Sequence, residues 1–123
     1  MASSGLERKQ VVCAEPDLAP GQMRVVYKGN VPVVVACTSP GTYRAVRGLC
    51  PHQGALLSKG VLWRLTLSDE PGSYALTEAE KILRCPWHGF DFDLDTGRCV
   101  GDERLRVRTH PVTVEDGWIV VEL

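Results

Sequence analysis

The sequence lacks a long apolar segment and an excess of charge of either sign. Its longest apolar runs, residues 31–36 and 118–121, are the length of strands, whereas a membrane-spanning helix needs about 20 apolar residues. Fourteen basic and fifteen acidic residues leave a formal net charge of −1. Because there is also no basic stripe with interleaved aromatic residues, we expect neither a membrane nor a nucleic acid as a partner.

The N-terminal segment MASSGLERKQ lacks the apolar core of a secretory signal peptide, so we expect a cytoplasmic protein. A length of 123 residues suits one domain, residues 1–123, with a core of its own. The five cysteines are an odd number and cannot all pair. In a cytoplasmic chain, cysteines more often bind metals or lie buried than form disulfides.

Short β-branched segments separated by turn residues predict an all-β domain. One segment, residues 58–81, breaks this rhythm and contains the loop sequence DEPGS. The expected strands are residues 10–13, 23–27, 33–37, 42–46, 82–84, 90–94, 105–114 and 118–122.

Histidine is scarce, and two of the three histidines lie beside cysteines. Cys50 precedes His52 in CPH, and Cys85 precedes His88 in CPWH. Two thiolates and two imidazoles form a possible metal-ligand set, and a zinc site of two cysteines and two histidines is one interpretation. Four ordinary buried residues are another interpretation.

The residues around both pairs favour a metal held by two loops. Pro51 and Pro86 follow the cysteines, while Gly54 and Gly89 stand where a tight loop needs positive φ. Each loop would present one sulfur and one nitrogen. Two such loops are suited to gripping a binuclear cluster from both sides.

The pattern Cys-Pro-His-x-Gly-x-x-Leu at 50–57, followed by Cys-Pro-Trp-His-Gly-Phe-x-Phe-Asp-x-x-Thr-Gly at 85–97, resembles the Rieske [2Fe–2S] proteins. It is most similar to the small Rieske ferredoxins. The resemblance implies a Rieske fold of stacked antiparallel sheets, with a cluster-binding subdomain at about 48–99 inserted into a larger base. It also implies one [2Fe–2S] cluster per chain. The implied ligands are Cys50 and Cys85 on one iron and His52 and His88 on the other.

The resemblance implies one-electron transfer, because such a cluster leaves no open coordination position for bond-making chemistry. Rieske potentials span roughly −150 to +300 mV, against about −400 mV for plant-type ferredoxins. High-potential members carry a disulfide between the loops and a serine after the second His-Gly. Here Gly54 or Ala55 and Trp87 stand at the disulfide positions, and Phe90 stands at the serine position. We therefore expect a potential in the lower part of the window.

By the same resemblance the chain is an electron carrier and not itself an enzyme. It would take electrons from a flavin-dependent NAD(P)H reductase to a terminal oxygenase. With two histidines on the cluster, only His110 remains. The chain therefore cannot build the site of two histidines and one carboxylate that holds iron in a complete oxygenase. A second interpretation is a redox-sensing or regulatory module that acts through partner binding.

One departure from the family is the spacing between the two loops. Thirty-two residues separate His52 from Cys85, more than is usual among Rieske ferredoxins. The extra length lies at about 61–81, where an insertion would either cover an imidazole or offer a surface specific to a partner.

The remaining polar candidates have simpler expected roles. Cys13 and Cys37 lie in apolar strands and should be core thiols, and Cys99 should pack near the second loop. His110 is expected on a strand surface. The arginines that alternate along one expected strand should share a face, which is either solvated or a docking surface for an acidic partner. These arginines are Arg104, Arg106 and Arg108.

Overall fold

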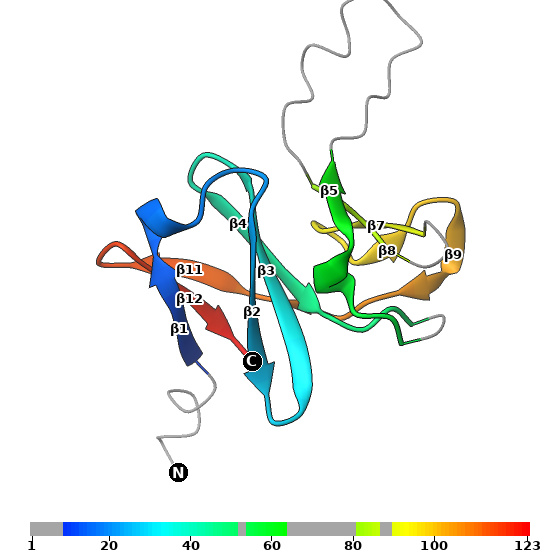
Figure 1. The fold of residues 1–123 in the computed structure, drawn as a ribbon, viewed down its shortest axis with the longest axis horizontal. Helices are drawn as coiled ribbons and strands as arrows, with labels where there is room; N and C mark the ends of the chain where they lie inside the picture. Colours follow the sequence, from blue (N-terminus) through cyan, green and yellow to red (C-terminus); the bar gives the residue numbers. More distant parts are fainter. Residues whose placement is uncertain (1–8, 52–53, 64–80, 87–89) are drawn as a thin grey trace, which may run out of the picture.

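The computed structural model describes residues 9–51, 54–63, 81–86 and 90–123, and within them the chain is built of antiparallel β-strands (Figure 1). The strands form three sheets, and two short 3₁₀ turns, Glu15–Asp17 and Leu57–Lys59, are the only helical segments described. No helix in this part of the chain has the length and hydropathy that crossing a bilayer requires. The predicted all-β fold of stacked antiparallel sheets is confirmed.

Two sheets form a unit that we call the base. Its outer sheet has the order β1-β12-β11 and its central sheet the order β10-β4-β3-β2. In the outer sheet the strands are β1 (Lys9–Ala14), β11 (Val112–Glu115) and β12 (Trp118–Glu122). In the central sheet they are β2 (Met23–Lys28), β3 (Val31–Ser39), β4 (Thr42–Arg47) and β10 (Thr109–His110).

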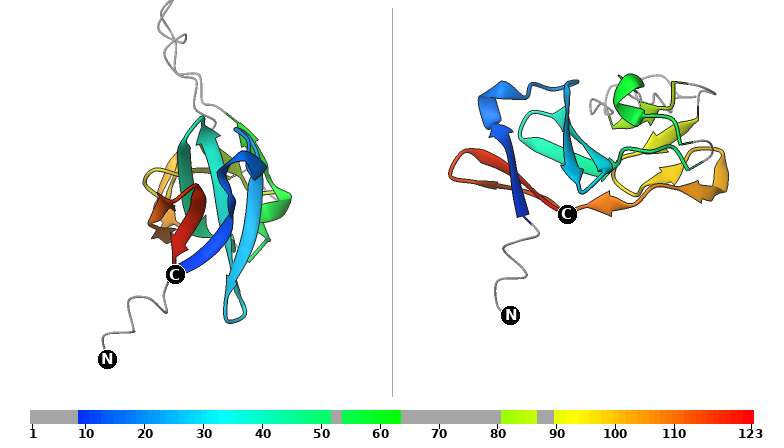
Figure 2. Two further views of the ribbon diagram at one scale, coloured as in Figure 1. Left: turned by 90° about the vertical axis from the view of Figure 1, so that its left-hand side faces the viewer. Right: turned by 60° about the horizontal axis from the view of Figure 1, so that its bottom comes forward.

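The third sheet has the order β5-β6-β7-β8-β9 and lies beside the base, as two further views show (Figure 2). None of its strands is longer than five residues. The last strand of this sheet ends at Arg106. It therefore lies beyond residue 99, where the cluster-binding subdomain was expected to end. The strands are β5 (Val61–Trp63), β6 (Ile82–Arg84), β7 (Asp91–Asp93), β8 (Arg98–Cys99) and β9 (Asp102–Arg106).

Strand β3 is buried on both faces, because each face of the central sheet contributes to a different core. Val33 and Val35 belong to a core shared with the outer sheet, where they meet Ile119. Val34 and Ala36 belong to a second core, which includes residues of the third sheet. Successive side chains of a strand point to opposite faces, so a strand between two cores is apolar at every position. This explains the unbroken apolar run of β3.

An ion-pair network links the central sheet to the third sheet across their polar edge. Arg44 of β4 donates from Nε to Asp95 Oδ1 at 2.8 Å, and Lys81 lies 3.2 Å from Asp95 Oδ2. Burial raises the pKa of Asp95, but the hydrogen bonds from these two cations outweigh it and leave the pKa below its ordinary value. Because these groups are partly exposed, we expect the network to orient the two units more than to stabilise them.

The expected strand at 105–114 is wrong. The chain there ends β9 in the third sheet, pairs briefly with β4 as β10, and then enters the outer sheet as β11. Pro111 stands at the last break, where its missing N–H removes a ladder hydrogen bond. Strands β5 and β8 were not predicted. They are only three and two residues long, too short to produce a readable alternation.

Candidate metal centre

The two predicted ligand cysteines begin matched loops. Cys50 follows β4, and its N–H donates to the carbonyl of Ala55 at 2.8 Å. Cys85 follows β6, and its N–H donates to the carbonyl of Phe90 at 2.7 Å. In each case the accepting carbonyl lies five residues beyond the cysteine. Each loop is therefore closed by an equivalent backbone hydrogen bond, although the two loops follow strands of different sheets.

The structure places both cysteines in one core. Cys50 and Cys85 are each 2% exposed and belong to the same buried cluster as Leu57 and Phe92. The other two predicted ligands, His52 and His88, lie outside the described residues, as do residues 64–80 of the predicted insertion. The described geometry therefore concerns the sulfur half of the expected ligand set.

The donor set fits an iron–sulfur cluster. Thiolates are the protein ligands of such clusters, and a thiolate without a cation is costly in an apolar core. Two nearly buried sulfurs, delivered by separate loops into one core, are suited to binding one group together. Backbone hydrogen bonds within the loops hold Cys50 and Cys85 in place, at 2.8 and 2.7 Å respectively.

Two glycines of the motifs stand where the backbone conformation or the available space favours glycine. Gly54 has φ of 73°, which confirms the positive φ predicted for it, and its N–H donates to the carbonyl of Cys50 at 2.7 Å. Gly97 has φ of 79°, and a Cβ there would lie 2.2 Å from the carbonyl oxygen of Val107. The Val107 N–H in turn donates to the Gly97 carbonyl at 2.7 Å. Gly97 therefore allows the end of the second motif to pack closely on the segment between β9 and β10. The other predicted glycine, Gly89, lies outside the described residues.

The other three cysteines are buried, as predicted. Cys13 and Cys37 lie in the core of the base, and Cys99 packs in the core that holds the ligand cysteines. Burial raises the pKa of the Cys37 thiol, with a smaller raising effect from Glu15. Burial, together with the nearby Asp102, also raises the pKa of Cys99. Both raised pKa values favour the protonated thiol at neutral pH.

The expectation for His110 is wrong. It is 8% exposed, and its Nδ1 lies 3.0 Å from the carbonyl oxygen of Glu122. A carbonyl only accepts, so Nδ1 carries the proton. Burial lowers the pKa of His110, and the cations Arg108 and Lys28 lower it further. The sequence analysis assigned this residue to a strand surface, but the chain leaves β10 for another sheet directly after it.

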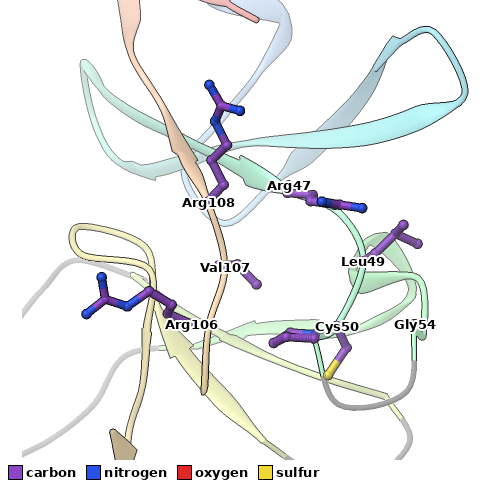
Figure 3. A pocket seen from close by; sticks show the side chains of 8 residues that line it. Arg47, Leu49, Cys50, Gly54, Arg106, Val107 and Arg108 are labelled. Carbon is purple, nitrogen blue, oxygen red and sulfur yellow. The ribbon is translucent and has the colours of Figure 1, made fainter. Parts of the chain in front are cut away.

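A concavity of about 380 Å³ opens beside Cys50, and three arginines line it (Figure 3). Two of them, Arg106 and Arg108, were singled out in the sequence. Arg104 was expected on the same face, but its Nε lies 3.2 Å from Asp102 Oδ1 and it does not line the concavity. The third, Arg47, was missed because it belongs to β4, far away in the sequence.

Comparisons with known proteins agree with this geometry. A family model described as the Rieske [2Fe-2S] domain matches residues 8–111. The ferredoxin component of the p-cumate 2,3-dioxygenase system of Pseudomonas putida is 32% identical over 114 residues, which are 91% of this chain and 83% of that protein.

A second relative is much longer than this chain. Apoptosis-inducing factor 3 of Mus musculus is 38% identical over 86 residues, which are 70% of this chain and only 11% of that protein. Among solved structures, a complex of reduced oxygenase and oxidised ferredoxin in carbazole 1,9a-dioxygenase contains a similar chain. Its TM-score is 0.73 at 26% identity, with 94% of this chain and 93% of that chain covered.

Proposed function

Because the chain belongs to the Rieske [2Fe–2S] domain family, we propose that it carries single electrons from a flavin-dependent NAD(P)H reductase to a terminal oxygenase. The family's cofactor is a [2Fe–2S] cluster, so the zinc interpretation of the Cys–His pairs is wrong. We assign Cys50 and Cys85 to one iron and His52 and His88 to the other.

The observation that carries the proposal is the pair of matched loops. When bound, a [2Fe–2S] cluster accepts and donates one electron at a time. Cys50 and Cys85 would hold it through sulfurs in an apolar core, where each cysteine is 2% exposed. Because both loops are closed by backbone hydrogen bonds from the cysteines, the ligands are held in place before and after the electron moves. Cysteine ligands held rigidly in this way suit an electron carrier.

The names of two relatives support an oxygenase as the electron acceptor. One is the ferredoxin component of a dioxygenase system, and another structure holds an oxygenase together with a ferredoxin. We propose an oxygenase as the acceptor and a cytoplasmic location for the chain. The flavin reductase is the donor that would supply single electrons from a two-electron nicotinamide.

A second candidate function is a redox-sensing module. It is favoured by one observation, that the match to apoptosis-inducing factor 3 covers only 11% of that protein. A domain of this family thus also occurs as a small part of a long chain. A sensor would exchange electrons slowly and change its affinity for a partner with redox state, whereas a carrier exchanges electrons fast in both states.

Stopped-flow spectroscopy of the cluster-loaded protein tests the carrier function. The protein is mixed with NADPH and a ferredoxin–NADP⁺ reductase, and then with oxidised cytochrome c. We expect the absorbance of the cluster to bleach as each chain takes up one electron, and to recover when cytochrome c is added. Catalytic amounts of the protein should also speed up the reduction of cytochrome c by the reductase. An iron-loaded protein that takes up no electron from the flavin enzyme, or gives none to cytochrome c, overturns the proposal.

A further inference from the structure

Three arginines surround the concavity beside Cys50, and we call this feature the arginine groove. Arg47 ends β4, Arg106 ends β9 and Arg108 follows two residues later. The Arg47 N–H donates to the Arg108 carbonyl at 2.8 Å, so the backbone fixes these two residues next to each other. All three side chains are exposed. The groove thus lies where the central sheet and the third sheet meet, directly beside a predicted cluster ligand.

The charge of the groove is not neutralised by the described residues. Three other arginines in the described part of the chain pair with carboxylates, and one of them is Arg44, with Asp95 at 2.8 Å. In the part of the chain that the structure describes, no carboxylate lies within 4.0 Å of a groove guanidinium. Further arginines with a carboxylate partner are Arg84, with Asp91, and Arg104, with Asp102.

A neighbouring concavity of about 250 Å³ extends the positive surface. It shares Arg47 and Arg108 with the groove and adds Lys28. The positive charges also act on His110: its pKa is lowered first by burial and then by Arg108 and Lys28. On a chain with a net charge of −1, positive charge is therefore concentrated on one side of the cluster end.

The shape of the groove suits a broad surface more than a small anion. In Figure 3 the three guanidinium groups point in different directions and do not converge on one point. The lining between them is apolar and includes Leu49 and Val107. Leu56, which is bridged to Leu49, is 45% exposed. An apolar centre with charges around its rim is the usual composition of a protein–protein interface.

We propose that the arginine groove docks a carboxylate-rich surface of the electron-transfer partner. The inference rests on the proposed carrier function and adds the charge and position of the docking face. Docking there places the partner beside the Cys50 loop, which is the short path that electron transfer needs. Unpaired arginines steer an acidic partner into this position and raise the rate of encounter. They contribute less once salt screens charges over about 8 Å.

The test compares two triple variants that lose the same charge. The groove variant replaces three lining arginines, and the control variant replaces three exposed arginines that do not line it. The groove variant is Arg47→Gln/Arg106→Gln/Arg108→Gln, and the control is Arg24→Gln/Arg98→Gln/Arg104→Gln. The three groove substitutions are also made singly, so that a triple variant that fails to fold does not end the test.

The probes are native cytochrome c, which is basic, and its succinylated form, in which carboxylates replace lysine charges. Each is mixed with the reduced, cluster-loaded protein in a stopped-flow instrument at low and at physiological ionic strength. With the succinylated form at low ionic strength, the groove variant should react about tenfold more slowly than the unsubstituted protein. The control variant should lose no more than about twofold. With native cytochrome c, the groove variant should react no more slowly than the control.

Equal slowing by the two triple variants would mean that only net charge matters, and the inference would then be wrong. Unchanged rates in the single variants and the groove triple would also overturn it. Both results leave the carrier function intact, because electrons still reach cytochrome c. If the unsubstituted protein passes electrons to neither form of cytochrome c, the carrier function itself fails.

Discussion

The base and the third sheet are both antiparallel, but they are held together in different ways. In the base, β3 is nine residues long, and seven successive residues of it are buried. In the third sheet no strand exceeds five residues, and three of the five have three residues. The base buries a long apolar strand between two cores, whereas the third sheet consists of short strands joined by turns and loops.

From this difference we expect the third sheet to depend more on its cofactor than the base does. Burial of apolar area stabilises a long strand without any other help. Short strands that cannot bury as much apolar area rely on tight turns, on packing against a neighbour and on bound metal. The two proposed ligand cysteines, Cys50 and Cys85, lie in the core that the third sheet shares with the base. We therefore expect substitutions facing this core to affect the cluster, and substitutions facing the other core to affect only folding.

Loss of a ligand cysteine should have the largest effect. We expect Cys50→Ser or Cys85→Ser to reduce iron from full occupancy to near zero, and to destabilise the third sheet because cluster binding contributes to folding. The control is Cys13→Ser, which changes a buried thiol of the other core and should retain its iron. Iron analysis and thermal unfolding of the purified variants are the measurements. Full iron occupancy in either ligand variant would show that the assigned ligands are wrong.

A methyl group at Gly97 should have the next largest effect. Gly97→Ala places Cβ 2.2 Å from a backbone carbonyl at φ of 79°. The backbone must move, so we expect a loss of about 3 kcal/mol or more in the free energy of unfolding. Gly101→Ala is the matched control, because it has φ of 92° but nothing within 4 Å of the added Cβ. It should lose only about 1–2 kcal/mol from backbone strain. Similar losses in denaturant unfolding would show that the close approach at Gly97 is unimportant.

Neighbouring valines of β3 sharpen the comparison between the two cores. Val34 faces the core of the cluster ligands and Val35 faces the core of the base, and both are almost completely buried. Val34→Ala and Val35→Ala remove the same atoms, so each should cost about 2 kcal/mol. Only Val34→Ala should lower iron retention or shift the potential, as measured by iron release and protein-film voltammetry. An equal effect of both variants on the cluster would mean that the two cores do not act separately.

The smallest effect concerns His110 in the base. Its pKa is lowered by burial from the ordinary value of 6.5, so below that value the unfolded chain binds a proton that the folded chain resists. Stability should be complete above about 6.5 and should fall as the pH drops through the lowered pKa. His110→Gln should remove this part of the pH dependence. Unfolding curves of both proteins measured across mildly acidic pH would test this, and parallel curves would contradict it.

Much of the fold was readable in the sequence because it depends on neighbours along the chain. Strands such as β2, β4 and β12 have a local alternation of apolar residues, and each was predicted to within two residues at either end. The expected strand at 105–114 failed because a polypeptide that passes through three sheets has no single alternation. Strands of two or three residues, such as β5 and β8, have too few residues to show any alternation.

The sequence by itself determined the two cysteine loops, because the spacing within each motif, the proline after each cysteine and the φ of Gly54 are all local properties. Only the tertiary structure decided what surrounds them. It brought Arg47 of β4 beside Arg106 and Arg108, and it buried His110 against the carbonyl of Glu122. Residues distant in the sequence meet only when the sheets pack, so no pattern along one segment could have predicted these contacts.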